Sequence, residues 1–143
     1  MQNVITREIT IQATQEAIYR AIADAEQVIK WFPEAIEGDY SVGQQPIFSF
    51  GDHGKNQVLI EEARPNDYFA YRWVPGANHF LGDVRSVPNT LVEFRISEET
   101  NGECTLTLTE SGFAALPPEM IDSAFQQNSN GWEFMLGRLQ TYL

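Results

Sequence analysis

The chain has 143 residues, of which 43% are hydrophobic and 20% are charged, and this balance excludes an intrinsically disordered polypeptide. Its formal net charge is −11 and its nine Lys and Arg residues are scattered, which excludes the clustered basic patch that nucleic-acid binding needs. A chain of this length is expected to form one domain over residues 1–143 with a core of its own.

The N-terminal part predicts one strand and two short helices. Apolar and polar residues alternate from Ile5 to Gln12, which is typical of a half-buried strand. Thr14 offers an N-cap oxygen, and apolar residues then recur at three- and four-residue spacing as far as Ala25, which predicts an amphipathic helix. A second short helical segment over residues 28–32 ends before Pro33.

The middle of the chain changes to strand signals separated by turn-rich stretches, and it includes one connection that is too long for a hairpin. That connection, Pro75–Asn89, contains apolar residues, so we expect part of it to fold onto the protein. Consecutive strands with tight turns favour an antiparallel sheet. The predicted strands are Ala35–Tyr40, Pro46–Phe50, Asn56–Ala63, Tyr68–Val74, Thr90–Ser97 and Cys104–Ser111.

The last segment predicts a long helix. It opens at Pro117 and Pro118, and apolar residues then recur every three or four positions from Ile121 to Tyr142. The order of elements is one strand, two short helices, six strands and one long helix. This order predicts an α+β fold.

The element order and several motifs resemble the START-like (SRPBCC, helix-grip) superfamily, and within it the family homologous to the C-terminal domain of the activator of heat shock protein 90 ATPase. The resemblance implies a curved seven-stranded antiparallel sheet wrapped around the C-terminal helix, with a cavity between them, and it supplies no shared catalytic motif. Its motifs are Ile9–Ala13 before a helix, Trp31, Gly43, Pro65, Tyr71–Trp73, Thr105–Leu108, Gly112–Phe113 and Gly131–Trp132 with Leu136 and Leu139.

Aromatic residues make up 12% of the chain, and many of them fall on the predicted inward faces of the strands and the long helix. Regular aromatic stripes are usual in packed cores, and they also line ligand pockets when polar residues interrupt them. Both interpretations are open from the sequence. The candidate ligand-binding residues are Trp31, Phe48, Phe50, Tyr71, Trp73, Phe94, Glu110, Phe125, Asn128, Trp132 and Met135.

Few polar residues are placed to hydrogen-bond a ligand in such a pocket or to act as an acid or base there. Glu110 has the strand parity of Leu106 and Leu108, so it either faces inward, or turns to solvent through strand twist or pairs with an arginine. Asn128 interrupts the apolar stripe of the long helix and offers an amide to a ligand or to the backbone. His79 lies in the long connection, and with Glu110 it is a weak candidate for acid–base catalysis.

Cysteine and histidine usage argues against a metal site. Cys104 is the only cysteine, so no disulfide forms within the chain, and with two histidines no metal-ligand spacing exists. No apolar run approaches the roughly 20 residues that a membrane-spanning helix needs. We therefore expect a cytoplasmic protein, monomeric or homodimeric, with no metal, no cofactor and no membrane span.

Three functions from different classes fit the sequence. The first is a binding protein for a small hydrophobic or amphipathic molecule. The second is an interaction module with a chaperone as its partner, as the family resemblance implies. The third is a cyclase, dehydratase or hydrolase that uses the same pocket for acid–base chemistry.

Overall fold

The computed structural model describes residues 3–75, 80–99 and 102–143. Its helices and strands follow the predicted order. They are β1 (Val4–Ile11), α1 (Gln15–Ala23), α2 (Ala25–Val28), β2 (Ala35–Glu37), β3 (Ile47–Ser49), the 3-10 turn η1 (Gly51–His53), β4 (Lys55–Gln57), β5 (Leu59–Arg64), β6 (Tyr68–Trp73), η2 (Val84–Ser86), β7 (Thr90–Glu98), β8 (Cys104–Ser111), η3 (Phe113–Ala115) and α3 (Pro118–Tyr142).

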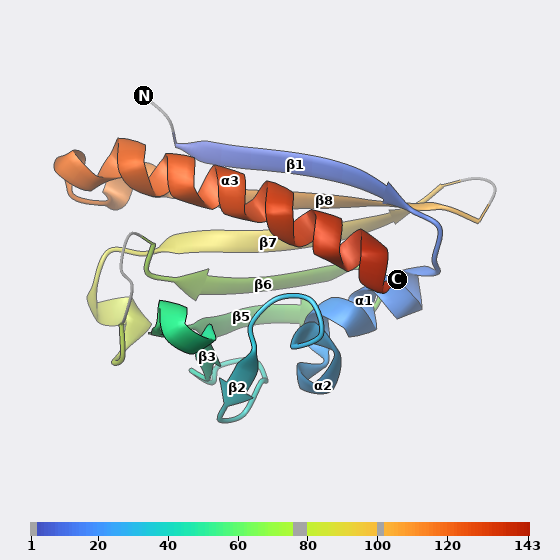
Figure 1. Cartoon of the computed structure of the whole chain (residues 1–143), viewed down its shortest axis with the longest axis horizontal. Coiled ribbons are helices and arrows are strands. Elements are labelled where there is room, and N and C mark those ends of the chain that lie inside the picture. The colour runs from blue at the N-terminus through green and yellow to red at the C-terminus, as the bar shows by residue number, and fades with distance from the viewer. Residues whose placement is uncertain (1–2, 76–79, 100–101) are drawn as a thin grey trace.

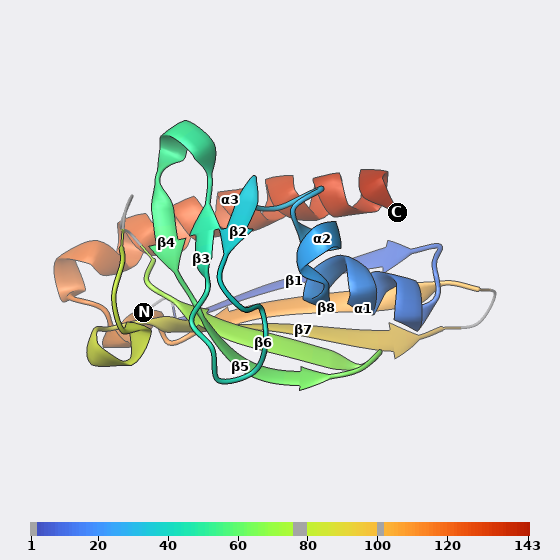
Figure 2. The ribbon, with the colours of Figure 1, turned by 90° about the horizontal axis from the view of Figure 1, so that it is seen from below.

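The strands form two antiparallel sheets. Five strands are ordered β1-β8-β7-β6-β5, and the other three are ordered β2-β3-β4. The long helix α3 crosses the five-stranded sheet along its length (Figure 1). Figure 2 shows that α3, the two short helices and the small sheet all lie on the same face of the five-stranded sheet. This is the helix-grip arrangement of an α+β fold that the sequence predicts.

The described residues form eight strands in two sheets, whereas seven strands in one sheet were expected. The difference arises because one predicted strand bends. The segment predicted over Asn56–Ala63 is divided at Val58 into β4 and β5, which belong to different sheets. The Val58 side chain is fully buried at the bend, and its N–H donates to the carbonyl of Pro46 at 2.9 Å. Satisfying the backbone in this way lets the chain change direction without leaving a buried polar group unpaired.

Capping residues set the ends of the first two helices. The Thr14 hydroxyl accepts from the N–H of Ala17 at 3.1 Å, as predicted. Asp24 then ends α1 and starts α2, because its carboxylate accepts from the N–H of Glu26 at 2.9 Å. The helix α2 lies earlier than predicted and ends at Val28, so Trp31 follows it in a turn.

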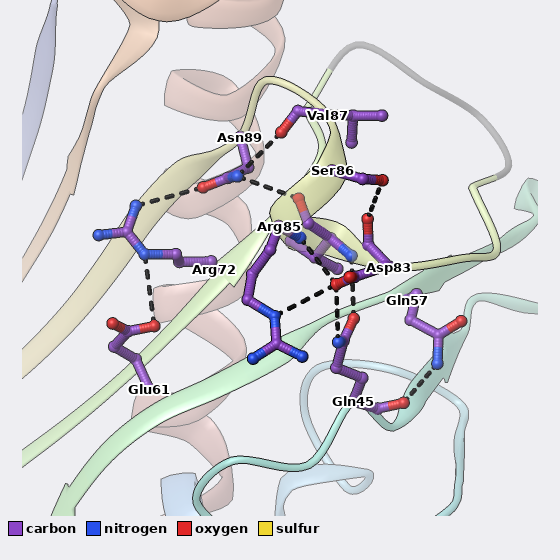
Figure 3. A network of polar contacts seen from close by, with 10 residues as sticks. Gln45, Gln57, Glu61, Arg72, Asp83, Arg85, Ser86, Val87 and Asn89 are labelled. Atoms are coloured by element: carbon purple, nitrogen blue, oxygen red, sulfur yellow. Dashed lines mark hydrogen bonds and ion pairs between the residues drawn. The ribbon is translucent and has the colours of Figure 1, made fainter.

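The described end of the connection between β6 and β7 packs against the small sheet. The Phe80 backbone exchanges hydrogen bonds with Lys55 and Gln57 of β4. Figure 3 shows a polar network beneath this segment, in which Gln45 donates to Asp83 at 2.9 Å and accepts from the N–H of Val84 at 2.9 Å. The Val84 side chain is fully buried, so it holds the described end of this connection against the rest of the protein.

The core lies between the five-stranded sheet, α1 and α3. From α3 it receives Ile121, Ala124, Trp132, Leu136 and Leu139. No helix in the described part of the chain is long and apolar enough to cross a membrane.

Candidate ligand-binding cleft

A cleft of about 480 Å³ lies beside the middle of α3. This volume falls within the range of roughly 300–1,000 Å³ that is usual for small-molecule sites. The walls come from the turn after α2, the hairpin between β3 and β4, the end of β6, and α3. The lining residues are Phe32, Phe50, His53, Asn56, Trp73, Gln127, Asn128, Gly131, Trp132 and Met135.

Four aromatic rings form one contiguous wall of the cleft. The Phe32 ring lies 5.7 Å from Phe50, 6.0 Å from Trp73 and 5.3 Å from Trp132 between ring centroids. The two indoles lie 5.7 Å apart and are tilted by 32°. Contacts at these distances are favourable pairings for aromatic rings. The wall is therefore a packed unit.

Glu110 lies behind this wall and is fully buried. It follows the inward parity of β8 and stands opposite Ile5 of β1 and Val92 of β7 in the sheet register. The sequence left two orientations open for this carboxylate. The structure has the inward one.

Four side chains donate hydrogen bonds to the Glu110 carboxylate. Oε1 accepts from the indole N–H of Trp132 at 2.7 Å. Oε2 accepts from the indole N–H of Trp73 at 3.0 Å, from the Asn128 amide at 2.8 Å and from the Thr90 hydroxyl at 2.6 Å. Buried carboxylates are tolerated when their oxygens are satisfied in this way.

The convergence on Glu110 fixes the orientation of the cleft wall. The donors come from β6, β7 and two adjacent turns of α3, so one carboxylate ties three elements together. Both indole rings have their N–H groups turned toward Glu110. We therefore assign Glu110 a positioning role behind the wall, and it is not among the residues that line the cleft.

Two buried oxygen atoms have no hydrogen-bond partner among the described residues, Asn56 Oδ1 and the Tyr71 hydroxyl. Asn56 lines the cleft, and its Oδ1 atom is itself buried. Tyr71 lies in the core, where burial raises its pKa well above the ordinary value, with smaller contributions from Tyr40 and Glu110.

The predicted site residues separate into three groups. Those on the cleft wall are Phe50, Trp73, Asn128, Trp132 and Met135. Those packed in or against the core without lining the cleft are Trp31, Phe48, Tyr71, Phe94 and Phe125. Glu110 lies between the two groups, and His79 lies outside the described residues.

Sequence reasoning missed part of the lining. Gln127 and Gly131 precede Met135 at four-residue spacing on α3, so helical periodicity is a signal that finds them. His53 and Asn56 lie on the hairpin between β3 and β4, and no periodicity places a hairpin over a helix. The described residues contain no cluster of side chains suited to hold a metal ion.

Solved structures with this fold have low sequence identity to the chain. DynU16, a protein in the dynemicin biosynthetic locus, has a TM-score of 0.78 at 22% identity over 99% of this chain, which spans only 47% of that chain's length. MLL2253 from Mesorhizobium loti has a TM-score of 0.78 at 19% identity over 97% of this chain and 95% of its own. The Aha1 dimer from Colwellia psychrerythraea has a TM-score of 0.74 at 20% identity, covering 97% of this chain and 94% of that chain.

These likenesses show the fold, and one of these neighbours is a dimer. A search of curated proteins finds no match. The family described as activator of Hsp90 ATPase homolog 1-like protein matches residues 12–143, which is most of the chain and includes every lining residue of the cleft. The chain therefore belongs to the family of activator of Hsp90 ATPase homolog 1-like proteins, within the START-like superfamily.

Proposed function

We propose that this protein binds a small apolar or amphipathic molecule in the cleft beside α3. The observation that carries the proposal is the fixed aromatic wall, in which two indoles are held on one buried carboxylate beside a space of about 480 Å³. Sites for small molecules combine such apolar walls with a few polar groups that orient the ligand. Here the amides of Asn56, Gln127 and Asn128 supply those groups.

The geometry favours binding over acid–base catalysis. A catalytic pair needs two titratable groups within reach of one bound atom. In the described residues His53 is the ionisable side chain on the cleft wall, while the Glu110 oxygens accept from four protein donors. We therefore place binding ahead of a cyclase or hydrolase activity.

Gly131 gives a direct test, because it lies on the cleft wall and a side chain there would enter open space. A Cβ atom added at Gly131 meets no heavy atom within 4 Å, and the same holds for Gly137, two turns further along α3 and outside the cleft. We expect Gly131→Leu to weaken binding of the neutral dye Nile red at least tenfold, and Gly137→Leu to leave it unchanged. Both substitutions favour helix, since leucine has a better helix propensity than glycine.

The titration is followed by dye fluorescence, with circular dichroism as the check on folding. Equal affinity in the wild type and in folded Gly131→Leu would show that the dye binds elsewhere, and no binding to the wild type would remove the proposal. A library of lipids and aromatic compounds, competed against the dye, would then identify the ligand class.

A second candidate is an interaction module that contacts a chaperone. The family description favours it, and so does Phe134, whose side chain is 65% exposed on the outer face of α3. Exposed aromatic residues are enriched at protein interfaces. A pull-down with the chaperone and an assay of its ATPase rate test this candidate, and Phe134→Glu is expected to abolish the complex while Nile red binding persists. No complex and no rate change with the wild type would exclude it.

A further inference from the structure

Among the residues that the structure describes, the walls of the cleft contain no fixed charge of their own. Apart from the rings, Met135 and Gly131, the lining residues are amides and His53, and no Lys, Arg, Asp or Glu is among them. The electrostatic character of the site therefore depends on the charge immediately behind the wall. That charge is the carboxylate of Glu110.

The described contacts of Glu110 are four hydrogen bonds from neutral donors, with no cationic side chain among them. The two indole N–H groups only donate, so the Glu110 oxygens that meet them accept, whereas the Thr90 hydroxyl and the Asn128 amide also have oxygen atoms that can accept. Each ion pair within the described ranges involves some other carboxylate. The Glu110 carboxylate is thus buried next to the cleft with only neutral partners among the described residues.

The aromatic wall lies between the Glu110 carboxylate and the cleft, and its rings are polarised by that carboxylate. The faces of aromatic rings carry negative electrostatic potential and attract cations, tryptophan most strongly. Trp73 and Trp132 each donate their N–H to Glu110, and hydrogen-bonded groups polarise one another in the direction of the bond. A cation in the cleft would meet two polarised indoles with an anion behind them.

We propose that the preferred ligand of the cleft is an organic cation, a quaternary or protonated amine attached to a small apolar group. This inference rests on the proposed binding function and names its ligand class. An anionic ligand would face the Glu110 charge with no cationic partner on the wall.

Two compounds of the same shape separate charge from hydrophobicity. They are 3-hydroxyphenyltrimethylammonium and 3-tert-butylphenol, in which a quaternary nitrogen replaces a quaternary carbon. Titration calorimetry at pH 7, where an ordinary histidine is mostly neutral and the hydroxyl groups of both compounds stay protonated, compares their affinities for the wild-type protein. We expect the cation to bind roughly tenfold more tightly, as cation–π attraction in a desolvated site allows.

Two variants test where the preference comes from. Glu110→Gln removes the charge at nearly constant shape, and it should reduce the ratio of the two affinities to within about twofold, whatever change the altered wall causes in both of them. Phe50→Leu removes one ring from the cleft wall and leaves Glu110 and its donors in place, so it should weaken the cation more than the neutral compound. Phe50→Leu keeps the test decisive if Glu110→Gln does not fold.

The outcomes distinguish this inference from the proposed function. Equal or tighter binding of 3-tert-butylphenol to the wild type overturns the cation preference, and the absence of binding by either compound does the same. If Nile red still binds in either case, and Gly131→Leu still blocks it, the cleft remains a binding site for neutral molecules. A cation preference that survives in folded Glu110→Gln would also contradict the inference.

Discussion

The helix α3 has two faces that meet the rest of the protein in different ways. One face carries Ala124, Leu136 and Leu139 into a closed apolar core, where each is at most 2% exposed. The neighbouring face carries Gln127, Gly131 and Met135, which border an open cleft. Both faces belong to one regular helix, so the difference arises from what lies opposite each face.

Trp132 stands on the boundary between these two faces. Its ring is 2% exposed and packs on Phe94 of the core at 5.9 Å, and it also lines the cleft. Its N–H is bound by Glu110 at 2.7 Å. The core gains stability by excluding polar groups, whereas the cleft wall gains a fixed geometry from a buried polar cluster. The two faces of α3 should therefore respond differently to substitution.

The largest effect is expected for Glu110→Ala. Removing the carboxylate leaves the buried donors of Trp132 and Thr90 without a partner, while Trp73 and Asn128 regain partial contact with solvent through the cleft. We expect the free energy of unfolding to fall by about 4 kcal/mol, measured by urea denaturation. Glu133→Ala on the exposed face of α3 is the control and should change it by less than about 0.5 kcal/mol. A loss as small as that of the control would mean that the cluster does not hold the wall.

A pair of adjacent residues on α3 measures the contrast between its faces directly. Leu136→Ala removes a side chain from the closed core and should cost about 3 kcal/mol through lost burial and an unfilled cavity. Met135→Ala trims the cleft wall, where solvent fills the space, and should cost about 1 kcal/mol. Both values come from urea denaturation of the two variants. Similar losses for the two would show that the cleft wall is as closely packed as the core.

Sequence reasoning predicted the fold because its signals are local. The alternation of β8 placed Glu110 on the side of Leu106 and Leu108, and helical spacing placed Asn128 and Trp132 on one face of α3. The bend at Val58 was missed because no Gly or Pro marks it, since the polar segment 55–57 passes directly into the apolar segment 58–60. Only the pairing of the flanking segments with two different sheets requires the bend.

The Glu110 cluster was beyond sequence reasoning, since its members are far apart in the chain. Trp73 stands opposite Thr90 in the register of β6 and β7, and Val92, two residues on, stands opposite Glu110. Those pairings depend on the register of the sheet strands. The position of Asn128 above the sheet depends on how α3 packs on it. Parity indicated which way Glu110 points, but it carries no information on which donors it meets.

The smallest expected effect concerns Tyr71, the core residue whose hydroxyl has no partner within the described residues. Tyr71→Phe removes an unsatisfied buried polar group at nearly constant volume, so we expect the protein to become about 1 kcal/mol more stable at pH 7. Because burial raises the Tyr71 pKa, the unfolded chain releases this proton first as the pH rises past 10, and ionisation then favours unfolding.

The stabilising effect of a protonated Tyr71 is therefore complete below pH 10 and is lost progressively above it. Urea denaturation at a series of pH values should show a shallower alkaline loss of stability in Tyr71→Phe than in the wild type. The residual loss comes from the other groups whose pKa values burial raises, which are Tyr19, Tyr40, Tyr68 and the Cys104 thiol. A less stable Tyr71→Phe variant would mean that the hydroxyl has a hydrogen-bond partner, such as a buried water molecule. The core around Tyr71 would then be less completely apolar than the core around Leu136 and Leu139.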